Sequence, residues 1–147
     1  MSNLMSERMA LVAALDPVAI PTGIVTTGWI DMAKTPNLLA VIMAGALGAG
    51  GTIDAKLQQA SSAAGAGAKD IAGKAITQLT QAGTNKSNKQ VQINLRGEEL
   101  DRNGGFSFVR LSMTVAVATS VAGAVVLGAG ARFGPSANAA SVIETVK

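Results

Sequence analysis

The sequence contains no cysteine and no histidine among its 147 residues. The absence of cysteine excludes disulfides, thiolate nucleophiles and cysteine-ligated zinc. The absence of histidine removes the commonest general base and the commonest transition-metal ligand, so serine-type triads and histidine-ligated metal sites are excluded as well. Because only carboxylate, lysine or carboxylate–metal chemistry is left, we expect a protein that is not an enzyme and that uses no cofactor.

Large side chains are scarce too, with one Trp, three Phe and no Tyr. Yet 48% of the residues are hydrophobic and the mean hydropathy is +0.36. The length fits a single domain, whose core must therefore be thin and built from Ala, Val, Ile, Leu and Met. A thin core combined with only 14% charged residues favours a homo-oligomer, in which other subunits cover part of the apolar surface.

The net charge of +3 would allow nucleic-acid binding, but the lysines and arginines are scattered along the chain. The densest basic stretch, residues 86–89, has the composition of a loop tip, and the aromatic residues are too few to stack on single-stranded bases. We therefore expect no direct nucleic-acid partner.

Two uncharged stretches raise the question of a membrane span. Residues 38–51 are fewer than the roughly 20 that a spanning helix needs. Residues 115–131 are rich in valine and are better explained as a pair of buried strands broken at Thr119 and Ser120. The first residues do not resemble a signal peptide, so the expected product is made in the cytoplasm and has no membrane partner.

Alternation of apolar and polar residues is the strongest pattern in the chain. Residues 90–96 and 109–117 both alternate in this way, which predicts two half-buried strands. Asn103 and Gly104 lie between them and supply the positive φ that a reversal needs, so an antiparallel hairpin is predicted. A second hairpin is predicted from residues 38–47 and 52–58, with its turn at the glycines of 48–51.

Further strands are predicted at 23–34 and 123–131, a loop at 61–67, and either a strand or a helix at 74–82. Short strands separated by Gly, Asn, Ser and Pro turns are typical of an all-β antiparallel sandwich or barrel. Residues 6–15 fit a short helix capped by Ser6, and fit an extended arm that docks on a neighbouring subunit equally well. The predicted division is an N-terminal arm at 1–22, a β-sandwich domain at 23–135 and a C-terminal tail at 136–147.

Two segments have residues that suggest a phosphate-binding loop and a calcium site. Residues 67–75 resemble a phosphate-binding loop, but five residues separate the glycines and Ala75 stands where a hydroxyl is needed, which favours a turn. Glu98, Glu99 and Asp101 are hard oxygen ligands, but they lack the spacing of a calcium loop and neighbour Arg96 and Arg102. A solvated or subunit-pairing loop is therefore favoured over a metal site.

Guanidinium groups and large aromatics are common where interfaces gain most of their binding energy. The single Trp fits a core role as well as it fits an interface role. Apolar residues of the N-terminal arm are further contact candidates. The candidate interface residues are Met9, Leu15, Trp29, Arg110, Arg132 and Phe133.

Several framework segments together resemble small structural proteins of tailed bacteriophages that are encoded among the head genes. The segments are residues 27–32, 52–60, 67–71, 108–115, 124–128 and 132–135. The resemblance covers most of residues 24–135 and implies a jelly-roll-like sandwich on the virion. It transfers the framework only and assigns no contact residue.

The expected function is therefore that of a capsid decoration or cement protein. Such a protein oligomerises on the surface of the head and stabilises contacts of the major capsid protein, which is the expected partner beside further copies of this chain. Two alternatives remain at this point: a head–tail connector or tail-associated structural protein, and a glycan-binding module for host attachment.

Overall fold

The chain folds into an all-β structure in a computed structural model that describes residues 4–131 and 137–146. A single 3-10 turn, η1 (Met5–Glu7), precedes the first strand, and a second one, η2 (Gly97–Glu99), follows the eighth. The strands are β1 (Met9–Ile20), β2 (Gly23–Thr26), β3 (Ile30–Asp31), β4 (Asn37–Ala44), β5 (Thr52–Ala60), β6 (Lys69–Ala75), β7 (Leu79–Thr80), β8 (Gln90–Arg96), β9 (Phe108–Ala116) and β10 (Ser120–Ala129).

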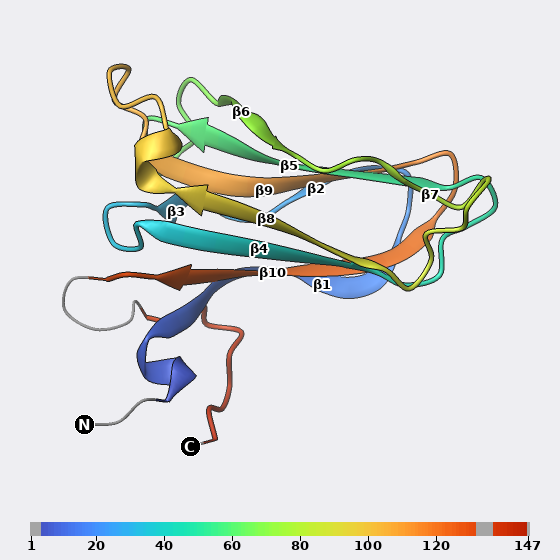
Figure 1. Ribbon diagram of the computed structural model, residues 1–147, viewed down its shortest axis with the longest axis horizontal. Coiled ribbons are helices and arrows are strands. Elements are labelled where there is room, and N and C mark those ends of the chain that lie inside the picture. Colours follow the sequence, from blue (N-terminus) through green and yellow to red (C-terminus); the bar gives the residue numbers. More distant parts are fainter. Residues whose placement is uncertain (1–3, 132–136, 147) are drawn as a thin grey trace.

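The strands form two antiparallel sheets that lie one above the other (Figure 1). Sheet A has the order β1-β10-β4-β8, and sheet B has the order β2-β9-β5-β6. The two-residue strands extend sheet B, because β3 pairs with β9 and β7 pairs with β5. We call the two ends of the sandwich the η2 end, on the left of Figure 1, and the β9–β10 end, on the right.

The core lies between the sheets and consists of aliphatic side chains. On β4, Leu38, Ala40 and Ile42 are buried while the residues between them are half-buried or exposed, which is the period of two that the sequence shows. Among the described residues, the largest fully buried side chains are isoleucine, leucine, methionine and valine together with Thr35 and Ser120, and none of them is aromatic. Trp29 is half-buried and is not part of this core cluster.

Both predicted hairpins are wrong, although their strands exist. β4 pairs with β10 and β8 in sheet A, whereas β5 pairs with β9, β6 and β7 in sheet B. In the same way β8 belongs to sheet A and β9 to sheet B. Alternation with a period of two shows which side of a strand is buried. A following strand buries that side whether it pairs in a hairpin or lies in the opposite sheet, so the pattern does not distinguish the two connections.

Three other segments differ in part from expectation. Residues 115–131 do contain two strands separated before Ser120, but β9 and β10 lie in opposite sheets and do not pair with each other. The strand expected at 23–34 is divided into β2 and β3, which both pair with β9. Residues 74–82 contain no helix, since β6 ends at Ala75 and β7 follows at Leu79.

The helix expected at residues 6–15 is wrong, because β1 occupies this segment and pairs with β10 from Met9 to Ile20. The expected arm at 1–22 is likewise not confirmed, since most of it is a strand of the chain's own sheet. A bulge between Leu15 and Val18 accommodates Pro17, which has no N–H to donate to the ladder. Pairing along a whole neighbouring strand outweighs the local helical spacing of a few apolar residues.

Gly123 faces the bulge and makes it possible. A Cβ at this position would lie 2.9 Å from Pro17 Cα, which is a backbone atom that cannot rotate away. Gly123 is buried although it lies on the outward side of β10, because Pro17 covers it. The proline in β1 and the glycine in β10 are therefore a matched pair.

The Gly123→Ala variant should unfold more easily than the wild type, by about 1–3 kcal/mol, because overpacking displaces β1 from β10. Gly28→Ala is the matched control, since nothing lies within 4 Å of a Cβ there, and its free energy of unfolding should stay near that of the wild type. Urea unfolding followed by circular dichroism measures both. Equal stability of the two variants would contradict the packing of Pro17 on Gly123.

Candidate interaction surfaces

The outward side of sheet A is apolar over three neighbouring strands. On β4 the outward residues alternate with the buried ones, and those of β10 and β1 are their register partners. No residue of β4 or β10 carries a charge. We call this surface the apolar face; its residues are Leu11, Leu39, Val41, Met43, Val121, Val125 and Leu127.

Strand β8 borders the apolar face with polar side chains. Gln90, Gln92 and Asn94 are exposed and stand opposite Met43, Val41 and Leu39 of β4. A row of amides beside an aliphatic strip is the arrangement of an interface centre with a polar rim. This border is uncharged until Arg96, the last residue of β8.

A groove of about 410 Å³ lies in the apolar face near the β9–β10 end. Val121 and Val125 of β10 and Met43 of β4 supply apolar walls, and Leu15 and Pro17 of β1 close it on the other side. Met43 is 53% exposed and Val121 is 38% exposed, which is unusual for large aliphatic side chains inside strands. The groove is therefore an open apolar site on an otherwise folded sheet.

The outward side of sheet B is polar instead. Lys56, Gln58 and Arg110 lie on β5 and β9, with Asp70 beside them on β6. Asp70 accepts hydrogen bonds from Lys56 Nζ at 2.9 Å and from Gln58 Nε2 at 3.0 Å. Arg110 Nε donates to Gln58 Oε1 at 2.9 Å, so the four side chains form one continuous row across three strands.

Trp29 lies at the end of this row, next to Arg110. The Arg110 guanidinium lies over the Trp29 ring, 4.6 Å from its centroid, which is a cation–π contact. A Cβ on Gly65 would lie 2.7 Å from Trp29 Nε1, so the β5–β6 loop also presses on the ring. The structure thus brings the predicted interface residues Trp29 and Arg110 together. The indole ring is held from two sides, and the guanidinium occupies the ring face that is turned towards Arg110.

The other predicted interface residues are dispersed. Met9 pairs with Ala129 at the η2 end of β1, and Leu15 lies beside the bulge, where it lines the groove. Arg132 and Phe133 lie outside the described residues. The groove residues of β4 and β10 are not among the predicted ones. The unbroken apolar run in both strands is a signal for them, because it is typical of a strand that is apolar on both sides.

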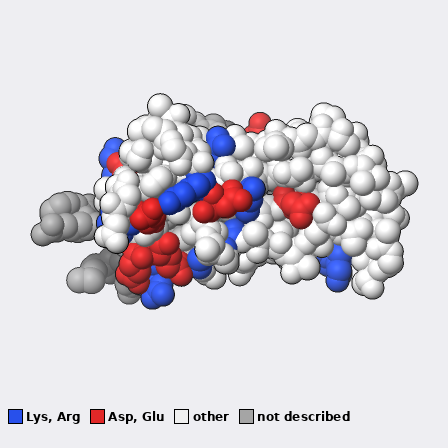
Figure 2. Space-filling model, turned by 90° about the horizontal axis from the view of Figure 1, so that it is seen from above, with Lys and Arg blue, Asp and Glu red and all other residues white. Residues whose placement is uncertain are grey.

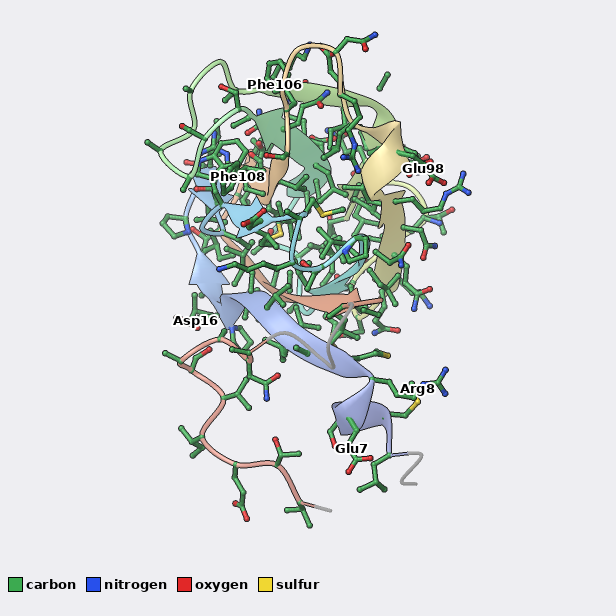
Figure 3. All side chains as sticks on the ribbon, turned by 90° about the vertical axis from the view of Figure 1, so that its left-hand side faces the viewer. Glu7, Arg8, Asp16, Glu98, Phe106 and Phe108 are labelled. Carbon is green, nitrogen blue, oxygen red and sulfur yellow. The ribbon has the colours of Figure 1, made fainter. Side chains whose placement is uncertain are left out.

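Charged residues gather towards the η2 end and over the middle of the face that Figure 2 shows. Figure 3 looks onto this end, where Glu98 projects away from the sandwich. Each carboxylate of the cluster weighed as a calcium site has a cationic partner: Glu98 pairs with Arg96, Glu99 with Lys74 and Asp101 with Lys69. In residues 4–131 and 137–146, no group of three or more potential metal ligands occurs.

Hydrogen bonding lowers the pKa of three carboxyl groups in this region. For Asp70 the main cause is the hydrogen bond from Gln58, followed by that from Lys56. For Glu99 it is the Arg96 backbone N–H followed by Lys74, and for Asp101 it is Lys69 followed by the Gly104 N–H. All three groups are solvent-accessible, so each contributes little to stability on its own.

Neither a family model nor a curated protein sequence matches the chain. Within the described ranges, no helix has the length and apolar character that crossing a membrane requires.

The lowered pKa of Asp70 predicts a loss of stability in acid. Because the folded state binds this proton less readily than the unfolded chain, the stabilisation is present above the unfolded pKa, about 4, and is lost as the pH falls from there through the lower folded pKa. Asp70→Asn should therefore show a smaller drop in the free energy of unfolding over this range than the wild type. Asp16→Asn is the control, since the Asp16 carboxylate makes no hydrogen bond or ion pair within residues 4–131 and 137–146. An equal change in both variants would contradict the role of the row.

Proposed function

We propose that the protein is a structural component of a bacteriophage virion, a capsid decoration or cement protein. In this proposal it oligomerises on the surface of the head and stabilises contacts of the major capsid protein. The proposal joins the sequence resemblance to two features of the fold, the order of the strands and the difference between the outward faces.

The strand order is the observation that carries the proposal. Without the two-residue strands β3 and β7, the first long strand pairs with the last, the second with the seventh, the third with the sixth and the fourth with the fifth. A long antiparallel hairpin that rolls up into two sheets has this pairing, and it is the pairing of the eight-stranded jelly roll. Viral capsid proteins are one of the classes that use this fold, as are lectins and cupins.

The apolar face supports the oligomeric part of the proposal. Aliphatic surface that spans three strands is costly to leave in water, and patches of this kind mark interaction sites on soluble proteins. The polar row of sheet B then remains for hydrogen bonds and ion pairs with the shell. Because Met9–Ile20 is paired with β10, the N-terminal segment that reaches a neighbour in this proposal is the part ahead of Met9.

Glycan binding is less well supported by the geometry. Sugar-binding sites commonly present a free aromatic platform, whereas the Arg110 guanidinium lies over the Trp29 ring and Gly65 lies close to its Nε1. A connector at the head–tail junction would use the same fold and is separated from decoration by copy number alone.

Quantitative gel analysis of intact particles tests the proposal. A decoration protein is expected in hundreds of copies, since many weak contacts add up on a shell, whereas about a dozen copies or fewer would indicate a connector. Particles that lack the protein should break at lower temperature and at low salt, and purified protein should restore their resistance. Particles that are equally resistant without it, and that fail to bind it, would refute the decoration role.

A further inference from the structure

We infer that the groove in the apolar face receives the C-terminal segment of a second copy of this chain, with Ile143 as the side chain that fills it. The inference deepens the self-association in the proposed function and rests on that part of it. It concerns contacts between copies, so it can hold or fail independently of any contact with a shell.

The C-terminal segment has a fixed start and a free apolar end. The Leu11 N–H donates to Asn138 Oδ1 at 2.9 Å, and the Ala139 N–H donates to the Leu11 carbonyl at 2.7 Å, so the segment is tied to the outer edge of β1. Beyond this point Ile143 is 96% exposed and Val146 is 84% exposed, the two highest values among the large hydrophobic residues that the structure describes. Figure 1 shows the segment leading away from the sandwich.

The groove has the shape and chemistry to take such a side chain. It is about 410 Å³ in volume, and β10 runs along it from Val121 to Val125, a length of about 13 Å at the usual rise per residue. None of the residues that line it is charged. An extended segment of four or five residues matches this length, and an aliphatic side chain matches the walls.

Charge gives the segment a direction in the groove. Glu144 follows Ile143 and carries the one negative charge of residues 139–146. On the β8 side of the groove, Lys89 stands in the chain between the lining residues Asn88 and Gln90, and its carbonyl accepts a hydrogen bond from the N–H of Ala44, a further lining residue. On the β1 side, Asp16 stands between Leu15 and Pro17. Glu144 is therefore favoured beside Lys89 and disfavoured beside Asp16.

The course of the segment favours a second copy over the chain's own groove. The segment leads away from the sandwich (Figure 1) and Ile143 is 96% exposed, so the chain's own Ile143 does not enter the groove. A protruding side chain and a groove at different places on one molecule make a head-to-tail contact, which either closes into a ring or continues as a chain. A ring or an array of copies is what a protein that covers a shell needs.

Cysteine crosslinking tests this contact on the purified full-length protein, and the absence of native cysteine makes each bond unambiguous. Two single variants, Ile143→Cys and Val121→Cys, are mixed and oxidised, and the product is separated without reductant. A strong mixed dimer band is expected, while Ala63→Cys, in the exposed β5–β6 loop, should give only background with Ile143→Cys. No mixed dimer, or equal yield with the control, would overturn the inference. A double variant that carries both Ile143→Cys and Val121→Cys is oxidised in the same way. If it forms only a crosslink within one chain, the inference is overturned too, because the chain's own segment then fills the groove.

A charge exchange provides a second, independent measurement by sedimentation equilibrium at low salt. Ile143→Asp should weaken self-association by about tenfold or more, as expected for the central side chain of a contact. Glu144→Lys should weaken it by a smaller factor, and adding Lys89→Glu should restore it, whereas Glu98→Lys at the η2 end should leave it unchanged. Failure of the second charge change to rescue the first would contradict the proposed orientation. Normal self-association together with no binding to particles would leave the inference intact and refute the decoration role.

Discussion

The short crossing between β9 and β10 is the constraint on which the rest of the structure depends. These strands occupy inner positions in opposite sheets, and only residues 117–119 join them. Packed sheets lie about 10 Å apart, and the four peptide units from Ala116 to Ser120 span about 13–14 Å when extended, so the connection has little slack. Val117 is accordingly held at a φ of 69°, a conformation that β-branched residues seldom adopt.

Neighbouring residues hold this crossing in place. Ser120 Oγ accepts a hydrogen bond from Gly48 N–H and donates one to the Ala118 carbonyl, which ties the crossing to the β4–β5 connection. Gly48 packs against the Thr119 carbonyl so closely that no side chain fits there. With β9 and β10 on opposite layers, β1 pairs with β10 and β2 with β9, and the pairs β4–β8 and β5–β6 lie inside them in the chain, which is the nested pairing of the eight long strands.

The sequence predicts the strands well and their partners poorly, for one physical reason. Alternation in residues such as Val91, Ile93 and Leu95 indicates that one side of a strand is buried, and the structure confirms this for β8 and β9. Whether the next strand lies beside it or across the core depends on the length and strain of the connection, which composition does not encode. The bulge at Pro17 shows the same limit, since its partner Gly123 lies more than a hundred residues away in the chain.

The candidate interaction surfaces, too, could be predicted only in part from the sequence. Trp29 and Arg110 are predicted from residue type, and the structure joins them through a contact between the β2–β3 connection and β9 that no local pattern reveals. The groove follows from the packing of backbone against backbone. Gly123 leaves room for Pro17, and Gly45 leaves room for Val121, whose carbonyl accepts its N–H at 2.7 Å. Both glycines also line the groove, together with Met43, Val121 and Val125, so the glycines that let sheet A close form part of the wall of its apolar groove.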